Sequence, residues 1–400
     1  MRPTLVALSL LAGLAPVAHA EVSTLSDAFT QGSTKLDFNL RYEYVEQDNI
    51  LKDADAFTLR TRLTYSTAPL HGLSGLVEFE DSRNVFGVDD YNDGNGSRPG
   101  YSVIADPNTT ELDQFLLRYQ RDTGPVKLDI KGGRQVIVFD NQRFVGHVGW
   151  RQDRQTFDGV TLMVSPLDGL DLNYGYISQR NRIFAEAKDV NANDHLINAG
   201  YKLPFGKLSG YGYLLDDEDM DDQIDTWGLR FAGDTALGES KLSYQLEWAT
   251  QEKDTAAGMS FDADYYLLEA GYSIFGLTAK LGYEVLGSDS GQYGFSTPLA
   301  TLHKFNGWAD QFLTTPNEGL ADLYLSVGGK LLSGSWAVIY HDFEADESSD
   351  GISDLGSEWD LSYSTKLAKH YTLGAKYAAY DAGDTKVDTD KFWLWASAAF

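Results

Sequence analysis

Two arginines, Arg60 and Arg62, stand two residues apart in a segment where apolar and polar residues alternate. If this segment is a β-strand, both guanidinium groups point to the same side, about 7 Å apart at about 3.3 Å per residue. Guanidinium groups bind carboxylates through two parallel hydrogen bonds. The pair is therefore a candidate contact for solutes that carry a carboxylate, provided that the strands around it hold it in a suitable place.

Other cations are predicted to share this side of the wall. By strand parity they are Arg41, Arg118, Arg230, Lys280, Lys127, Lys131 and Lys376. Acidic residues such as Asp37, Glu43 and Glu284 have the same predicted orientation. Two interpretations follow: a basic stripe that guides anions, or a mixed-charge surface on which each cation is paired with an acid.

The alternation of apolar and polar residues defines the elements that carry these charges. It is unbroken from Lys35 to Tyr44 and recurs in segments 240–249 and 277–285. Segments of about ten residues suit tilted strands that cross a bilayer, and closure into a barrel pairs every strand edge. The sequence thus predicts an all-β fold, a transmembrane up-and-down antiparallel β-barrel. The residues predicted to face lipid include Leu40, Leu59, Val77, Leu246 and Leu281.

Eighteen segments fit this pattern, and the count is fixed to within two. They are 35–45, 56–65, 73–80, 112–121, 126–135, 154–164, 170–179, 194–202, 207–215, 225–233, 240–249, 262–273, 277–285, 321–330, 335–344, 355–365, 371–380 and 391–400. Connections after even-numbered segments are short, whereas 81–111, 136–153 and 286–320 are long. Short periplasmic turns and long outer loops are typical of outer-membrane barrels. About eighteen strands enclose a lumen too wide for wall side chains to fill.

The two ends of the chain carry targeting signals. Residues 1–20 predict a cleaved secretory signal peptide, since Arg2 precedes a short apolar stretch that ends in Ala18-His19-Ala20. A retained anchor helix is the alternative, and residues 21–400 are predicted to form one barrel domain. The terminal Phe400 closes an amphipathic strand, which resembles the signal read by the barrel-insertion machinery. We expect a bacterial outer-membrane location, with membrane lipid and lipopolysaccharide as the surroundings.

Composition and motifs exclude several function classes. The formal net charge of -27 argues against nucleic acid as a partner, and the absence of cysteine excludes disulfides. No catalytic motif surrounds the histidines, so we expect no catalytic residue, no enzyme activity and no cofactor. The acidic run 216–222 lacks the glycine and spacing of an EF-hand loop. We therefore expect a solvated outer loop and no metal site there, with bound calcium as the alternative.

Two stretches resemble the alginate-export family of outer-membrane channels. They are 133–159, which includes Phe139-Asp140-Asn141-Gln142-Arg143-Phe144, and 297–320, which includes His303-Lys304-Phe305-Asn306-Gly307-Trp308-Ala309-Asp310. The resemblance implies an eighteen-stranded barrel with an arginine-lined path for an anionic polyuronate. Carried onto this chain, it implies that the path includes Arg134, Arg143, Arg151 and Arg154. It also makes His303, Lys304, Trp308 and Asp310 candidate residues of a loop that folds over or into the pore.

These observations lead to one functional hypothesis. The chain is expected to be a passive outer-membrane porin for anionic solutes, either small molecules or polymeric uronates such as alginate. Its high acidity and inward glutamates depart from the family pattern and count against a polyanion. A structural or adhesive barrel that acts through its outer loops is the alternative. Segment 286–320, with Trp308 and Phe312, is expected to fold inward, because it would otherwise expose an apolar patch.

Overall fold

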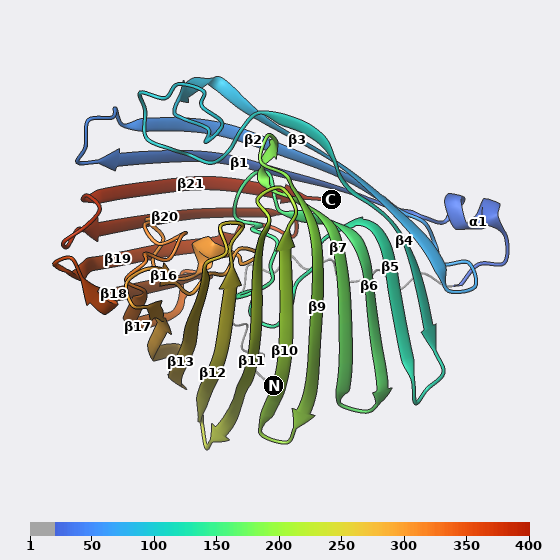
Figure 1. The fold of residues 1–400 in the computed structure, drawn as a ribbon. Helices are drawn as coiled ribbons and strands as arrows, with labels where there is room; N and C mark the ends of the chain where they lie inside the picture. Colours follow the sequence, from blue (N-terminus) through green and yellow to red (C-terminus); the bar gives the residue numbers. More distant parts are fainter. Residues whose placement is uncertain (1–20) are drawn as a thin grey trace.

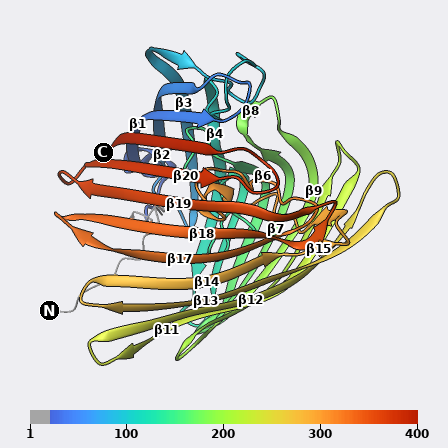
Figure 2. The same cartoon turned by 90° about the vertical axis from the view of Figure 1, so that its left-hand side faces the viewer.

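The computed structural model describes residues 21–400, so the predicted signal peptide at 1–20 lies outside the described residues. The chain forms a closed barrel of eighteen antiparallel strands (Figures 1 and 2). The wall closes where β21 (Thr389–Ala399) pairs with β1 (Ser33–Gln47), from Asp37 opposite Ala399 to Gln47 opposite Thr389. Closure leaves no unpaired strand edge for lipid to meet. The predicted fold and strand number are confirmed.

Each predicted segment overlaps one barrel strand. The other sixteen are β2 (Ala54–Ser66), β3 (Leu73–Asp90), β4 (Thr109–Asp122), β5 (Lys127–Gln135), β6 (Thr156–Leu167), β7 (Leu170–Asn181), β9 (Val190–Leu203), β10 (Gly206–Asp217), β11 (Asp222–Leu237), β12 (Ser240–Asp254), β13 (Ser260–Ile274), β14 (Leu277–Leu286), β17 (Leu320–Leu331), β18 (Gly334–Ser349), β19 (Ile352–Lys366) and β20 (Tyr371–Asp381). Several strands extend past the predicted ends, as β3 does by ten residues, because backbone pairing continues where side-chain alternation weakens. Three short strands lie in the loops: β8 (Ile183–Glu186), β15 (Ser288–Asp289) and β16 (Tyr293–Gly294).

A short helix, α1 (Leu25–Thr30), precedes the wall and was not predicted from the alternation. Its N-terminus is capped by Thr24, whose Oγ1 accepts a hydrogen bond from the Asp27 amide at 3.1 Å. The Ala28 carbonyl accepts a hydrogen bond from Ala68 in the turn between β2 and β3. The helix therefore sits at the short-turn end of the barrel (Figure 1). No helix within residues 21–400 is long and apolar enough to cross a membrane.

The two faces of the wall separate apolar from charged side chains. Leu246 is 48% exposed and pairs with Leu268, and Leu281 is 56% exposed and pairs with Leu325. The other residues predicted to face lipid also have apolar register partners, because Leu40 pairs with Leu59 and Val77 pairs with Phe115. The apolar belt is thus on the outside of the barrel. Charged inward side chains are buried because loops cover them.

Two long connections fold into the barrel and form its core. We call residues 136–155 the first lumen loop and residues 287–319, which contain β15, β16 and the 3-10 turn Leu302–Lys304, the second lumen loop. Phe144 of the first loop packs against Tyr211 and Tyr265 of the wall. Phe312 of the second loop packs against Phe343 and Tyr380. The inward course of 286–320 follows the expectation from its apolar content.

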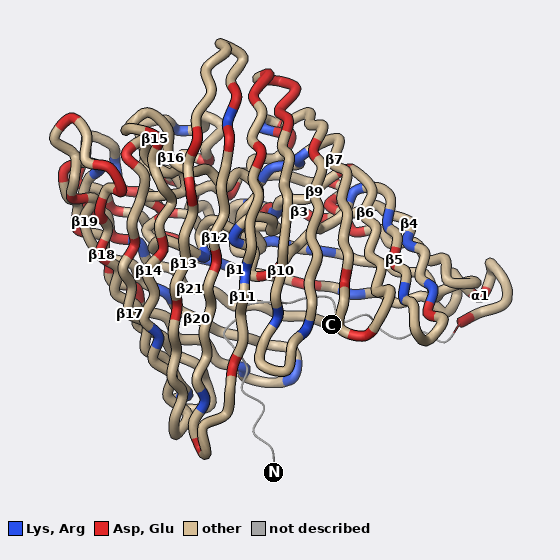
Figure 3. The backbone as a smooth tube through the Cα atoms, turned by 60° about the horizontal axis from the view of Figure 1, so that its bottom comes forward, with Lys and Arg blue, Asp and Glu red and all other residues tan. Residues whose placement is uncertain are grey.

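Acidic residues gather on the long loops at the other end of the barrel from α1 (Figure 3). The acidic run 216–222 forms the hairpin turn between β10 and β11. The Asp219 carboxylate accepts hydrogen bonds from the backbone and side-chain amides of Asn191, both at 2.8 Å. Residues 218–221 of the run are exposed, and Asp219 has a protein hydrogen-bond partner at this loop tip.

Candidate functional site in the barrel lumen

The arginines of the first lumen loop bind acids of the wall and of the second loop. Arg151 Nη1 donates to both carboxylate oxygens of Glu43 at 3.0 Å, and its Nη2 donates to Asp310 Oδ2 at 2.9 Å. Arg154 binds Glu78, and it lies 2.7 Å from Asp113. These buried ion pairs attach the loop to β1, β3 and β4.

Arg143 is the third arginine of the first lumen loop that binds an acid elsewhere in the barrel. We call Arg143, Arg151 and Arg154 the clamps of this loop. Its Nε donates to Glu284 at 2.8 Å and its Nη2 donates to Asn306 Oδ1 at 3.0 Å. The guanidinium also lies 4.8 Å from the ring centroid of Phe305, within cation–π range. Arg143 thus joins the first lumen loop to the wall strand β14 and to the second lumen loop.

The strand arginines lie in the lumen and also have partners. Arg60 donates to Asp37 at 2.6 Å, and Arg62 binds Glu80. The remaining pairs are Arg41 with Asp106 and Glu43, Arg118 with Asp129, Arg230 with Glu247 and Lys280 with Glu269. This arrangement matches the mixed-charge interpretation, because the expected basic stripe is a set of ion pairs.

Arg134 departs from its expected inward position. It is in register with Phe115 on β4, which is 61% exposed, and with Asp158 on β6. Residues in register share a face, so Arg134 lies on the outward face, where its Nε donates to Asp158 at 2.7 Å. The alternation runs through Gly132 and Gly133 without a register shift. Arg134 is therefore not a pore-lining residue.

His303 of the second lumen loop lies in a network of aromatic rings and charges. Its Nδ1 is 2.6 Å from Asp310 Oδ1, and its Nε2 is 3.0 Å from Lys376 Nζ. Burial lowers the pKa of His303 to about 3, so the ring is neutral at neutral pH. The neutral ring donates from Nδ1 to Asp310 and accepts at Nε2 from Lys376.

Tryptophans enclose Lys376 in this network. Its Nζ lies 3.9 Å from the ring centroid of Trp150 and 4.1 Å from that of Trp308. The Trp150 ring stacks on His303 at 4.9 Å. His303, Trp308 and Asp310 thus hold the second loop in place, whereas Lys304, the remaining residue of the predicted pore loop, is exposed.

Lys304 belongs to a basic patch on the side of the short turns. Its Nζ donates to the Asn141 carbonyl at 2.8 Å and has no acidic partner among residues 21–400. Lys304 is solvent-exposed, but the surrounding barrel partly desolvates its ammonium group, and this desolvation together with the charges of Lys280 and Arg230 lowers the pKa of Lys304. We call Arg230, Lys280 and Lys304 the vestibule patch.

A cavity of about 160 Å³ lies between the second lumen loop and the wall. Its polar lining comes from Arg143, Arg182, Ser296, Thr297, Thr314 and Thr315, and its apolar lining from Leu286, Pro298, Leu302, Phe312 and Leu313. Arg143 is fully engaged, as described above. The cavity therefore combines hydroxyl groups, an apolar wall and a second arginine.

Arg182 follows β7 and differs from the other lumen arginines. Within the described chain its guanidinium makes no hydrogen bond and no ion pair, although Asp189 and Asp217 exert a weaker attraction. Burial and the charge of Arg180 lower the pKa of Arg182. Arg180, two residues earlier, binds Asp194 through two hydrogen bonds of 2.8 and 2.7 Å. Arg182 was not among the residues predicted to line the pore, and its only sequence signal is the spacing of two from Arg180.

Comparisons with known proteins point to one class. A family model described as Alginate export matches residues 31–284, more than half of the chain. The outer membrane protein OpdK from Pseudomonas aeruginosa is 17% identical, with a TM-score of 0.68, and the match covers 92% of this chain and 98% of OpdK. A structure of OpdK with vanillate has a TM-score of 0.67 at the same 17% identity, covering 92% of this chain and 98% of that one. OccAB4 from Acinetobacter baumannii is 14% identical, with a TM-score of 0.71 and coverage of 96% of this chain and 99% of that one. The comparison with curated proteins gives no significant match.

Proposed function

The chain belongs to the alginate export family and is an outer-membrane β-barrel of the porin type, and on that basis we propose that it is a passive channel for small solutes that carry a carboxylate. The proposed flux follows the concentration gradient and needs no cofactor. The family and its structural neighbours are described as export or outer-membrane proteins, which supports transport over catalysis.

The observation that carries this proposal is the unpaired guanidinium of Arg182 at the cavity. A guanidinium without an acidic partner is available to bind a carboxylate through two hydrogen bonds. Thr297 and Thr315 line the same cavity. Thr297 Oγ1 accepts from Arg143 and Thr315 Oγ1 donates to the Phe295 carbonyl, so each hydroxyl keeps hydrogen-bonding capacity for a hydroxylated solute such as a uronate. Pockets for drug-sized ligands have about 300–1,000 Å³, so this smaller cavity favours a small organic acid.

The lumen loops favour a small solute over a polymer. Arg143, Arg151 and Arg154 hold the first loop to the wall and to the second loop through buried ion pairs. An extended polyuronate would have to displace these loops and break such pairs. The structure of OpdK with vanillate supports the same choice, since vanillate is a small aromatic carboxylate and OpdK shares the fold. We therefore expect the channel to pass alginate monomers and short uronates in preference to polymeric alginate.

The vestibule patch supplies an electrostatic reason for anion entry. Lys304 is exposed on the side of the short turns, close to Lys280 and Arg230. A charged patch on low-dielectric walls raises the local concentration of oppositely charged solutes. Because Arg230 and Lys280 are paired with Glu247 and Glu269, the uncompensated positive charge of the patch is that of Lys304, which attracts anions that approach the lumen from the short-turn side.

Bilayer recordings on the purified barrel test the proposal. We expect a measurable single-channel conductance, with galacturonate more permeant than an uncharged sugar of similar size. Arg182→Gln should reduce that preference, and the matched control Arg98→Gln, in an exposed outer loop, should leave it unchanged. An equal preference in wild type and Arg182→Gln contradicts the role of Arg182. A barrel without conductance favours the structural or adhesive alternative.

A further inference from the structure

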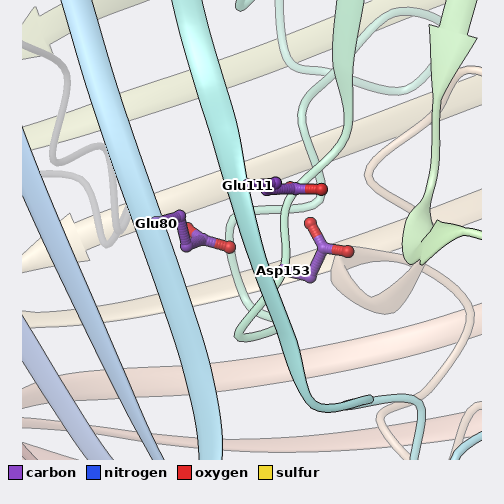
Figure 4. A group of neighbouring side chains, drawn as sticks. All are labelled: Glu80, Glu111 and Asp153. Atoms are coloured by element: carbon purple, nitrogen blue, oxygen red, sulfur yellow. The ribbon is translucent and has the colours of Figure 1, made fainter.

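Three carboxylates from three segments meet beside the first lumen loop (Figure 4). They are Glu80 of β3, Glu111 of β4 and Asp153 of the loop, and one oxygen of each lies within 4.8 Å of the others. Calcium binds oxygen ligands at about 2.3–2.6 Å, so two of its ligands lie at most about 5 Å apart. The three oxygens are therefore close enough to share one ion.

Two of these carboxylates are buried and incompletely satisfied. Glu80 is 1% exposed and Asp153 is 0% exposed, yet Glu80 Oε1 and Asp153 Oδ1 accept no hydrogen bond within residues 21–400. Their other oxygens are used, by Arg62 Nε for Glu80 and by the Ala185 amide, at 2.9 Å, for Asp153. Buried polar atoms in folded proteins nearly always have a partner, so two unpaired oxygens within this group of neighbouring carboxylates indicate a bound ion or a shared proton.

The local charge balance also favours a cation. Glu78 and Asp113 flank the three carboxylates, and the two arginines that bind this group are Arg62 and Arg154. Within residues 21–400, no arginine lies within ion-pair distance of Glu111 or Asp153. The next cations are engaged elsewhere, since Arg60 binds Asp37 and Arg134 binds Asp158.

The acidic surplus also affects proton binding at Asp153. Burial, together with the facing charges of Glu111 and Glu80, raises the pKa of Asp153 well above its usual value. The negative charge can therefore be relieved either by a proton shared between carboxylates or by a metal ion. A chelator distinguishes these two states, because it removes a bound metal ion and leaves a shared proton in place.

We propose that Glu80, Glu111 and Asp153 bind one hard divalent cation, with Ca²⁺ as the preferred ion. Carboxylate-only ligands select calcium or magnesium over softer metals, and an irregular site with a partly exposed member, Glu111, suits calcium, whose geometry is flexible. The ion would join β3 and β4 to the loop that carries Arg151 and Arg154. Its role is to pin the first lumen loop to the wall, and this role stands apart from the proposed transport of carboxylates.

Calcium titration of the folded, chelator-treated barrel tests this site. We expect one tight Ca²⁺ per chain in calorimetry and a higher unfolding temperature with Ca²⁺ than with chelator. Glu111→Gln and Asp153→Asn should each weaken Ca²⁺ binding about tenfold or more, since charged ligand number sets affinity. Glu111→Gln is the safer variant for folding, because Glu111 forms no ion pair with arginine in the described residues.

The control removes an acid from the outer loop. Asp219→Asn should keep the tight site, because Asp219 lies in the exposed run 216–222. Loss of the tight site in Asp219→Asn would assign calcium to that loop and overturn the proposal. The proposal would also be overturned if Glu111→Gln and Asp153→Asn bound Ca²⁺ as tightly as the wild type. If the wild type bound no Ca²⁺, the proposal would fail and the carboxylates would share a proton instead.

Discussion

The lumen contains two regions whose cations have the same chemistry and different surroundings. Around the first lumen loop, Arg143, Arg151 and Arg154 each bind a buried acid. At the cavity and the vestibule patch, Arg182 and Lys304 have no acidic partner within the described residues. The first region is a set of clamps, and the second offers charges to a solute. Inward orientation alone therefore does not make an arginine a binding residue, because its partners decide whether it is available.

The strongest test of this comparison reverses the charge of two paired arginines. Replacing Arg60 and Arg62 together by glutamate places two new acids beside Asp37 and Glu80. Like charges in a buried site repel each other and lose their hydrogen bonds, so we expect the barrel to fail to assemble. Heat-modifiable migration of outer-membrane fractions measures assembly. The double lysine variant is the control, and a folded double glutamate variant with altered ion selectivity would restore the basic-stripe interpretation.

A single clamp should have the next largest effect. Arg151→Gln removes the guanidinium that binds both carboxylate oxygens of Glu43 and one of the three partners of Asp310, which leaves His303 and Lys391 on Asp310. Breaking a buried ion pair costs about 3–5 kcal/mol. Denaturant unfolding measures the loss, and a higher conductance should accompany the loosened loop. Arg182→Gln, which breaks no ion pair, should change the free energy of unfolding by less than about 0.5 kcal/mol. Equal losses in the two variants would erase the distinction between the regions.

The clamp region should also lose stability in mild acid. Burial lowers the pKa of His303 to about 3 and that of His147 to about 4, whereas unfolded histidine titrates near 6.5. Between these values the unfolded chain binds more protons, so the free energy of unfolding falls as pH drops below 6.5, by up to about 1.4 kcal/mol per pH unit for each histidine. The depressed pKa of Asp310 adds to this loss only below about pH 4.

Unfolding titrations from pH 7 to pH 4 measure this slope. His303→Gln should reduce it, although the variant starts from a lower stability at pH 7. His71→Gln, at an exposed turn, is the matched control and should keep the wild-type slope. A slope that His303→Gln does not change would show that the second lumen loop opens before its histidine is protonated.

The smallest effect is expected in the vestibule patch. Lys304→Gln removes one exposed charge that has no acidic partner, so assembly and stability should be unchanged. Reversal potentials should shift slightly toward cations at low salt, and the shift should vanish near 1 M salt, where the screening length is about 3 Å. Lys369→Gln, at a short turn outside the patch, controls for net charge. A shift that persists at high salt would indicate direct contact with the permeating ion.

Most of the wall could be predicted from the sequence. Alternation is a local property with a period of two, so Lys35 to Tyr44 alone shows which face is apolar, and short connections set the antiparallel order. The family resemblance agreed with the strand number. The inward position predicted for Arg134 was wrong. Uninterrupted alternation from Lys131 through Gly132 and Gly133 places Arg134 on the outward face.

The partners of the lumen charges were beyond the reach of the sequence. Arg143 and Glu284 are 141 residues apart in the chain, and no local pattern links them. Arg180 and Arg182 have the same spacing as Arg60 and Arg62, yet Arg182 alone has no acidic partner in the described structure. The sequence by itself determined the barrel, its strand number and its two faces, because these depend on neighbouring residues. The tertiary structure decided which cations are clamps and which are free, because loop folding into the lumen sets the distances between charges far apart in the chain.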